Sequence, residues 1–119
     1  MWSIGTIIPE MVTGHPLFPG DSEIDEIFKI FRLLGTPNES LWQGVSQLPD
    51  YKTNFPKWSP KPLRDVVPQT DRLCDAGLDL IAQMLAYTPN SRIVAKEALE
   101  HRYFDGLNTA TVGTIPLPF

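Results

Sequence analysis

Residues 16–39 read Pro16-Leu17-Phe18-Pro19-Gly20-Asp21-Ser22-Glu23-Ile24-Asp25-Glu26-Ile27-Phe28-Lys29-Ile30-Phe31-Arg32-Leu33-Leu34-Gly35-Thr36-Pro37-Asn38-Glu39, and this stretch predicts one complete helix. Asp21 or Ser22 can accept hydrogen bonds from the first free backbone N–H groups, and Ser22 with Asp25 has the form of a capping box. The acidic side chains of the first turn favour the positive end of the helix dipole. Gly35 can adopt a left-handed C-cap conformation, and Pro37 cannot continue a helix.

The helix predicted over residues 22–34 is amphipathic. Its apolar side chains recur every three or four residues and form one stripe, which consists of Ile24, Ile27, Phe28, Ile30, Phe31 and Leu34. Between them lie three charged side chains, Glu26, Lys29 and Arg32, which are expected to face water.

Length and composition limit the classes of protein. The 119 residues are 42% hydrophobic, which is enough for one modest domain with one core. The net charge of −4 argues against a broad nucleic-acid surface. The single cysteine, Cys74, allows neither an internal disulfide nor a zinc cluster and predicts an intracellular setting, in cytoplasm or nucleus. Residues 1–11 resemble neither a signal peptide nor a membrane span, so no membrane partner is expected.

Three more helices are predicted. Residues 2–13 are apolar nearly all round, which indicates a buried helix, although Pro9 should kink or shorten it between Gly5 and Pro9. Residues 75–86 have a helical period, with Leu78, Ile81, Met84 and Leu85 on one face. A short helix is expected over residues 94–100.

Two segments are predicted to be irregular. Residues 36–72 carry repeated prolines that interrupt any ordinary helix, but they also hold apolar anchors that a disordered linker would lack. A short helical turn is expected within this insert, over residues 39–45. Residues 105–119 have no period and predict a loose tail.

Several sequence strings resemble the large lobe of the cyclin-dependent protein kinases. Pro-Gly-Asp-Ser-Glu-Ile-Asp, the Ile-Phe-Lys-Ile-Phe core and Leu-Gly-Thr-Pro are similar to the segment around helix G. Leu-Pro-Asp-Tyr-Lys, Phe-Pro-Lys-Trp and Val-Val-Pro resemble the insert between helices G and H. Trp2-Ser3 is similar to the start of helix F, and residues 88–104 resemble the closing motif of kinase domains. The resemblance implies a mainly α, partial large lobe over residues 1–104, with helices F, G, H and I.

The family's catalytic motifs do not occur in this chain. Phosphoryl transfer by a kinase uses a glycine-rich loop, a lysine–glutamate pair, His-Arg-Asp and Asp-Phe-Gly. The sequence has no Gly-x-Gly-x-x-Gly, His-Arg-Asp, Asp-Phe-Gly or Ala-Pro-Glu. Although the family uses ATP and Mg²⁺, we therefore predict no catalytic, cofactor-binding or metal-binding residue here, and the chain alone should be inactive.

Other chemistry is weakly supported. His15 or His101 could pair with a serine or Cys74 in a hydrolase, but both histidines are flanked by turn residues and are more typical of structural histidines. The acidic residues at the start of the 22–34 helix could suggest a divalent metal site. They fit helix capping better, because no calcium-loop spacing is present.

The resemblance also implies a docking surface for the small cyclin-kinase-subunit (Cks) proteins. Its candidate residues are Asp21, Ser22, Glu23, Ile24, Asp25, Pro49, Asp50, Tyr51 and Lys52. The alternative is that these residues only cap a helix and fold a turn. Most contacts of the family with cyclin lie outside the matching segment, so little cyclin binding is expected.

Three positions match structural motifs of the family: Trp2, Gly5 and Arg92. The arginine normally pairs with the glutamate of Ala-Pro-Glu, which this chain lacks. Arg92 should therefore turn to solvent or find another carboxylate, because a buried unpaired charge is costly.

Two hypotheses remain. The chain is either part of an active cyclin-dependent kinase, which transfers the ATP γ-phosphate to protein substrates at serine or threonine followed by proline, or a non-catalytic module or kinase remnant that binds Cks-type subunits. Departures from the family pattern at Pro9, Thr88 and Arg102 favour the second hypothesis.

Overall fold

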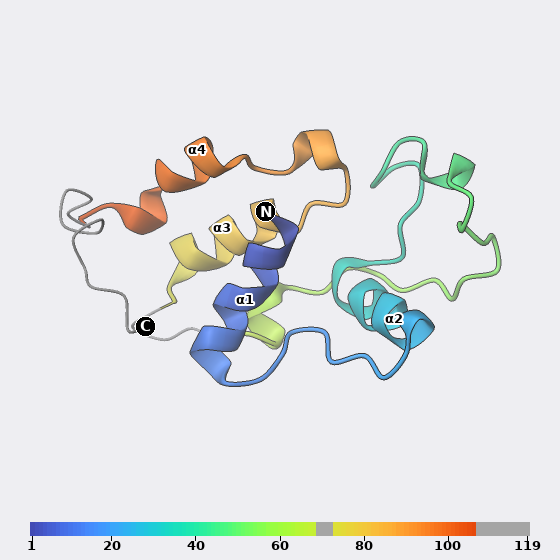
Figure 1. Ribbon diagram of the computed structural model, residues 1–119, viewed down its shortest axis with the longest axis horizontal. Helices are drawn as coiled ribbons and strands as arrows, with labels where there is room; N and C mark the ends of the chain where they lie inside the picture. Colours follow the sequence, from blue (N-terminus) through green and yellow to red (C-terminus); the bar gives the residue numbers. More distant parts are fainter. Residues whose placement is uncertain (69–72, 107–119) are drawn as a thin grey trace, which may run out of the picture.

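The computed structural model describes residues 1–68 and 73–106, which form helices joined by irregular segments (Figure 1). Its α-helices are α1 (Trp2–Thr13), α2 (Glu23–Leu34), α3 (Asp75–Met84) and α4 (Ala95–Leu99). Short 3-10 helices lie at η1 (Val45–Gln47), η2 (Leu63–Asp65), η3 (Pro89–Ser91) and η4 (Arg102–Phe104). These two ranges contain no β-strand, so the predicted mainly α fold is confirmed.

The helix ends lie close to those predicted from sequence. Ser22 is the N-cap of α2, and α3 ends at Met84, two residues before the predicted limit of 86. The insert is irregular over its described part, where backbone turns from Asn38 lead into η1. Residues 69–72 of the insert and 107–119 of the tail lie outside the described residues. No helix in the described part of the chain is long and apolar enough to cross a bilayer.

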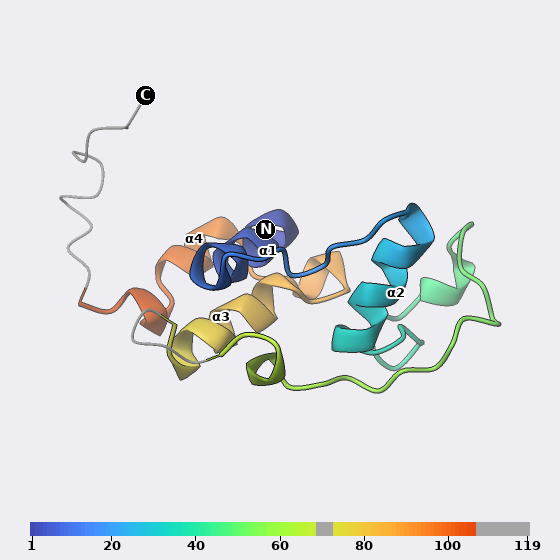
Figure 2. The ribbon, with the colours of Figure 1, turned by 90° about the horizontal axis from the view of Figure 1, so that it is seen from below.

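Helix α3 forms the centre of the main core. It packs against α1 and against η4, and α4 lies on the side of α3 away from η2 (Figures 1 and 2). The buried side chains around it are Val67, Leu73, Leu78, Leu80, Ile81, Met84, Leu85, Ile93 and Ala98. Leu80 joins the face predicted from sequence, so α3 is buried over a wider arc than its 3.6-residue pattern indicated.

The prediction that residues 2–13 form a buried helix is correct for the helix but wrong for the burial of one side. On α1, Ile4, Ile7 and Met11 are 46%, 49% and 76% exposed. These residues are three and four apart and form one outward stripe, because the described chain packs only against the other side of α1. Apolar composition alone could not show which side would be covered.

Pro9 does not shorten α1, which continues to Thr13. The proline ring is fully buried, and this packing offsets the hydrogen bond that proline removes. Gly5 has a separate role, because a Cβ atom there would lie 2.8 Å from the Cβ of Met84. The missing side chain allows α1 and α3 to approach closely.

Helix α2 has its own aromatic core, remote from α3. Phe28 and Phe31 contact the rings of Phe55 and Trp58 at centroid distances of 5.4–6.2 Å. Thr36, which is 5% exposed, fixes the insert beside these rings. Its hydroxyl donates to the Pro56 carbonyl at 2.6 Å and accepts from the Trp58 N–H at 2.9 Å. A buried hydroxyl with both partners satisfied holds the irregular chain in one place.

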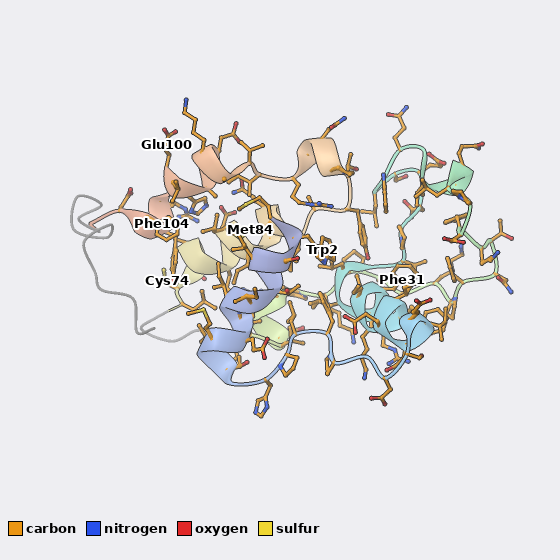
Figure 3. The ribbon with its side chains drawn as sticks, viewed as in Figure 1. Trp2, Phe31, Cys74, Met84, Glu100 and Phe104 are labelled. Atoms are coloured by element: carbon orange, nitrogen blue, oxygen red, sulfur yellow. The ribbon has the colours of Figure 1, made fainter. Side chains whose placement is uncertain are left out.

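A stack of aromatic rings joins α1, the segment after α3 and the loop before η1. Tyr87 lies between Trp2 and Trp42, with centroid distances of 6.2 and 6.0 Å, and its hydroxyl donates to the Gly35 carbonyl at 2.6 Å. Figure 3 shows Trp2 on the side of α1 that faces this junction. Burial raises the pKa of Tyr87 well above its usual range, so the phenol stays a donor.

Arg92 is half-buried and forms no ion pair with a carboxylate within residues 1–68 and 73–106, contrary to the sequence expectation. Its guanidinium donates to the Ala86 and Tyr87 carbonyls at 3.0 and 3.2 Å and lies 5.3 Å from the centroid of the Trp2 ring. Backbone carbonyls after α3 and an aromatic face thus take the place of the missing glutamate.

Candidate functional site

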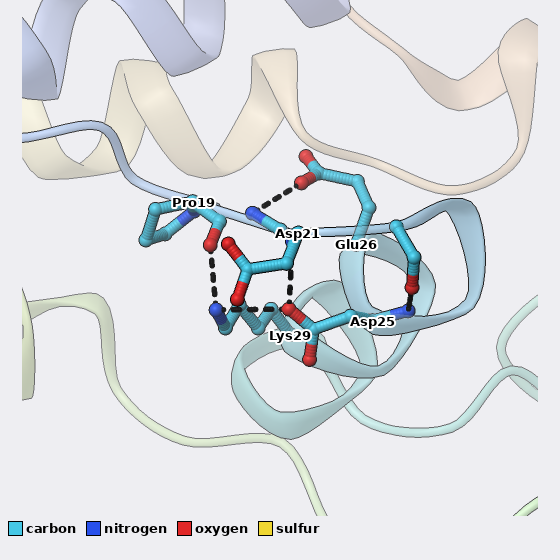
Figure 4. A network of polar contacts seen from close by, with 7 residues as sticks. Pro19, Asp21, Asp25, Glu26 and Lys29 are labelled. Atoms are coloured by element: carbon cyan, nitrogen blue, oxygen red, sulfur yellow. Dashed lines mark hydrogen bonds and ion pairs between the residues drawn. The ribbon is translucent and has the colours of Figure 1, made fainter.

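The start of α2 is tied to the loop before it by a network of short polar contacts (Figure 4). The Gly20 N–H donates to Glu26 Oε2 at 2.7 Å, and the Asp21 N–H donates to Asp25 Oδ2 at 2.9 Å. Lys29 Nζ donates to the Pro19 carbonyl at 2.5 Å and lies 3.0 Å from Asp25 Oδ2. Two carboxylates and one ammonium group therefore hold three consecutive loop residues, Pro19 to Asp21, against the helix.

This network differs from the capping box expected from sequence. The Asp25 N–H does donate to Ser22 Oγ, at 3.2 Å, as a capping box requires. The Asp25 carboxylate, however, reaches back to the N–H of Asp21 rather than to that of Ser22. Glu26, which was expected to face water, is half-buried and caps one residue further back, at Gly20.

The same network sets the protonation state of Asp25. The hydrogen bond from the Asp21 N–H is the main cause that lowers the pKa of this carboxyl below its usual value, and Lys29 lowers it further. The carboxylate is therefore ionised at neutral pH. The acidic residues act as helix caps here, which supports the capping interpretation over a metal site.

An apolar groove of about 340 Å³ lies between α2 and the loop that contains η1. Ile27 and Phe31 form its α2 wall, and Trp42 and Val45 line it from the loop. Its far rim is the segment Leu48-Pro49-Asp50-Tyr51, with the Tyr51 ring 5.9 Å from that of Phe55. The groove is mostly hydrophobic and has one carboxylate, that of Asp50, at its edge.

Glu39 holds the loop in the shape that forms this groove. Its carboxylate accepts hydrogen bonds from the Gly44 N–H at 2.6 Å, the Ser46 N–H at 3.2 Å and the Ser46 hydroxyl. These bonds, that of the hydroxyl foremost, lower the pKa of Glu39. Ionised Glu39 thus fixes the turn between Trp42 and Val45, both of which line the groove.

The structure brings only some of the candidate docking residues into one cavity. Pro49, Asp50 and Tyr51 line the groove, whereas Lys52 does not. Residues 21–25 also lie outside its lining, but Ile24 is half exposed and lies one helical turn before Ile27. Ile24 thus extends the groove face by one turn, whereas Asp25, which is bound to Lys29, lies on the other side of the helix.

The loop residues that shape the groove were not predicted from the sequence. Trp42, Val45 and Leu48 belong to the insert, whose apolar side chains were expected to act as anchors, but the sequence did not mark them as parts of a site. The signal that could have found them is the spacing of three residues between Trp42, Val45 and Leu48, which leads into the Leu-Pro-Asp-Tyr string.

His101 has a structural role. Its Nε2 lies 2.7 Å from Asp79 Oδ2 on α3, and its Nδ1 accepts a hydrogen bond from the Tyr103 N–H at 3.0 Å. Both ring nitrogens are occupied, so the ring is not available to activate a nucleophile. The hydrogen bond from His101 is also the main cause that lowers the pKa of Asp79.

The glycine-rich loop, His-Arg-Asp and Asp-Phe-Gly are absent from the sequence of this chain, and residues 1–68 and 73–106 hold no group of three His, Cys, Asp or Glu side chains suited to a metal. No step of phosphoryl transfer is assigned to them.

The family follows from comparison with models of known protein families. The protein kinase domain model matches residues 1–104, which include all four α-helices described above. The match covers most of the 119 residues, so the chain belongs to the protein kinase family.

Proposed function

We propose that the chain is part of a cyclin-dependent serine/threonine kinase and corresponds to helices F to I of the large lobe. The support is the string of capping, acidic and turn residues around α2, together with Leu-Pro-Asp-Tyr-Lys in the insert. The parent reaction would transfer the ATP γ-phosphate to serine or threonine followed by proline. The chain by itself would be inactive, because it lacks the groups that hold ATP and Mg²⁺.

The outward face of α1 supports a role within a larger lobe. Ile4, Ile7 and Met11 form an apolar stripe that nothing in the described residues covers. Such a stripe is typical of a surface that packs against further protein.

We further propose that the groove between α2 and the η1 loop docks a Cks-type subunit. The observation that carries this proposal is that Pro49, Asp50 and Tyr51 line the same cavity as Ile27 and Phe31, one turn from the acidic start of α2. A partner for this surface would present an apolar centre with cationic groups around it.

The loop and α2 are held by contacts within the chain itself, through Glu39 and Lys29. A rigid surface loses less entropy on binding than a mobile one. This favours a second candidate function, in which the chain acts as a non-catalytic module that binds the subunit.

Titration calorimetry of the 119-residue chain with a purified Cks-type subunit tests the docking proposal. Ile24→Glu and Asp50→Lys should each weaken binding about tenfold or more, because one places charge beside the apolar groove and the other reverses charge at its rim. Leu99→Glu is the matched control, since Leu99 is 70% exposed on α4 and distant in the fold. Docking elsewhere is indicated if both groove variants bind like the parent chain.

Two assays separate the functional candidates. In the first, the chain is incubated with ATP, Mg²⁺ and a Ser-Pro peptide, and no transfer is expected. In the second, binding of the Cks-type subunit is compared between this chain and a kinase domain that includes the ATP site. Equal affinity favours the module, whereas much weaker binding by the chain favours a role only within the larger kinase.

A further inference from the structure

A second groove lies on the opposite face of α2. Each residue turns an α-helix by about 100°, so Lys29, Arg32 and Leu33 point away from the face that carries Ile27 and Phe31. These three residues line a cavity of about 210 Å³, which is closed by the loop before α2 and by the chain from Lys61 to Val66. We call it the cationic groove.

The cationic groove combines an apolar floor with a positive rim. Leu17, Phe18, Leu33 and Val66 form its floor. Three cations, those of Lys29, Arg32 and Lys61, line it as well, although the chain as a whole has a net charge of −4. Such a concentration of positive charge in an acidic protein creates a local field that favours an anionic ligand.

Two of the three cations are available to a ligand. Lys29 is bound to Asp25 and to the Pro19 carbonyl. Arg32 is exposed and lies 5.2 Å from the centroid of the Trp58 ring, and neither it nor Lys61 forms an ion pair within the described part of the chain. Lys61 is nevertheless fixed in place, because its backbone N–H donates to the Leu33 carbonyl at 2.8 Å.

The cationic groove adjoins a second cavity. A neighbouring cavity of about 300 Å³ shares Leu17, Pro19 and Val66 with it and reaches Pro9 and His15. The two cavities therefore form one trough along residues 15–19, between α2 and the end of α1. A trough of this kind fits an extended chain better than a compact ligand.

We propose that the cationic groove binds an extended acidic peptide that places one apolar side chain on its floor. A free phosphate would not use the apolar floor. The narrower cavity is smaller than the roughly 300–1,000 Å³ typical of small-molecule sites, but it suits a single aliphatic side chain. Carboxylates on either side of that residue reach Arg32 and Lys61. This proposal is independent of the docking groove, which lies on the other face of α2.

The probe is a fluorescein-labelled acidic heptapeptide, Glu-Asp-Glu-Leu-Asp-Glu-Asp, titrated with the 119-residue chain and followed by fluorescence anisotropy. Binding should weaken as NaCl rises from about 50 to about 500 mM, because exposed charges are screened. Replacing the central leucine of the peptide by alanine should weaken binding several-fold, since the floor then loses its ligand.

Two variants localise the site, each with a matched control. Arg32→Gln with Lys61→Gln should weaken binding at least about fivefold, whereas Lys57→Gln with Lys96→Gln removes two exposed cations elsewhere and should not. Val66→Asp places a carboxylate on the floor and should abolish binding. Val66 is 47% exposed, so this change should not unfold the chain, and Leu99→Asp is its control.

Backbone amide shifts of the unmodified chain give a readout that does not depend on any variant. The peptide should shift residues 17–19, 29–33 and 61–66. The proposal is overturned if no peptide binds up to about 1 mM, if the alanine peptide binds equally, or if the shifts lie outside these segments. Binding of anionic vesicles in place of the peptide, with loss in Arg32→Gln with Lys61→Gln, would also overturn it in favour of a lipid surface.

Discussion

Replacing Arg92 with methionine removes the interactions that replace the family's missing glutamate. The guanidinium donates to the carbonyls of Ala86 and Tyr87 and lies over the Trp2 ring. Methionine keeps much of the packing volume but offers neither donors nor charge. The substitution therefore tests whether these contacts stabilise the fold or contribute nothing measurable to it.

The magnitude follows from the contacts. A hydrogen bond from a charged donor contributes about 1.5–3 kcal/mol, and an exposed cation–π contact about 0.5–1 kcal/mol. Because Arg92 is half-buried, the lower ends of these ranges apply. Two such hydrogen bonds and one cation–π contact then give an expected loss of about 3.5 kcal/mol in the free energy of unfolding for Arg92→Met. Arg92→Lys keeps the charge, but a single ammonium group cannot match the fork of two donors, so a loss of about 1–1.5 kcal/mol is expected.

The assay is urea unfolding followed by far-ultraviolet circular dichroism, with the slope of the transition fitted for each variant. Arg64→Met is the matched control, because Arg64 is exposed and forms no hydrogen bond or ion pair within residues 1–68 and 73–106. The reasoning fails if Arg92→Met lies within about 0.5 kcal/mol of Arg64→Met at an unchanged slope.

Three further predictions follow from other parts of the structure. Gly35→Ala should lower the unfolding free energy by about 2 kcal/mol, because Gly35 has φ +89° and the new Cβ would lie 2.8 Å from Pro60. Gly44→Ala is the control in the same urea assay. Gly44 also has φ +89°, but no atom lies near the new Cβ, so this substitution should destabilise the fold less. The pKa of Asp25 is lower in the folded chain than in the unfolded chain, where it is near 3.8. The ionised carboxylate therefore stabilises the fold above the unfolded pKa, and this stabilisation is lost as pH falls through the folded pKa. Asp25→Asn should therefore flatten the decline in urea midpoint below about pH 4, and an unchanged decline would contradict this. Met11→Glu, at a side chain 76% exposed, should reduce self-association in analytical ultracentrifugation without lowering the unfolding free energy, and unchanged association would exclude this face as its cause.

Local signals explain what the sequence predicted well. Ser22, Gly35 and Pro37 mark the ends of α2 through backbone chemistry that depends on neighbouring residues only. Backbone details that depend on packing between distant residues were predicted less accurately. Gly35 has the expected positive φ but an extended ψ of 147°, because its backbone must pass Pro60 and its carbonyl must reach Tyr87.

The predicted apolar stripe of α2 was wrong in two places for the same reason. Ile24 is 50% exposed, whereas Leu33, which was not included, is 5% exposed. Leu33 is covered by the chain around Lys61, some thirty residues later, which forms the cationic groove with it. Periodicity identifies apolar side chains, but it cannot show which distant segment will cover them.

The apolar groove between α2 and the η1 loop was predictable only in part. Its Pro49-Asp50-Tyr51 rim came from a recognisable string, but its loop wall depends on Glu39, whose carboxylate reaches Gly44 and Ser46. The contact of His101 with Asp79 spans 22 residues and leaves no sequence pattern at all. Polar contacts between residues far apart in the sequence are therefore the part of a site that is hardest to predict from the sequence.

Lys29 connects the two surfaces of α2. Its ammonium group binds Asp25 and the Pro19 carbonyl, which fixes the acidic start of the helix, and the same residue lines the cationic groove. The peptide proposed above pairs with Arg32 and Lys61, so Lys29 stays bound to Asp25 and the acidic start of α2 keeps its place. Because coupling between two ligands is reciprocal, filling one groove should then leave the affinity of the other unchanged.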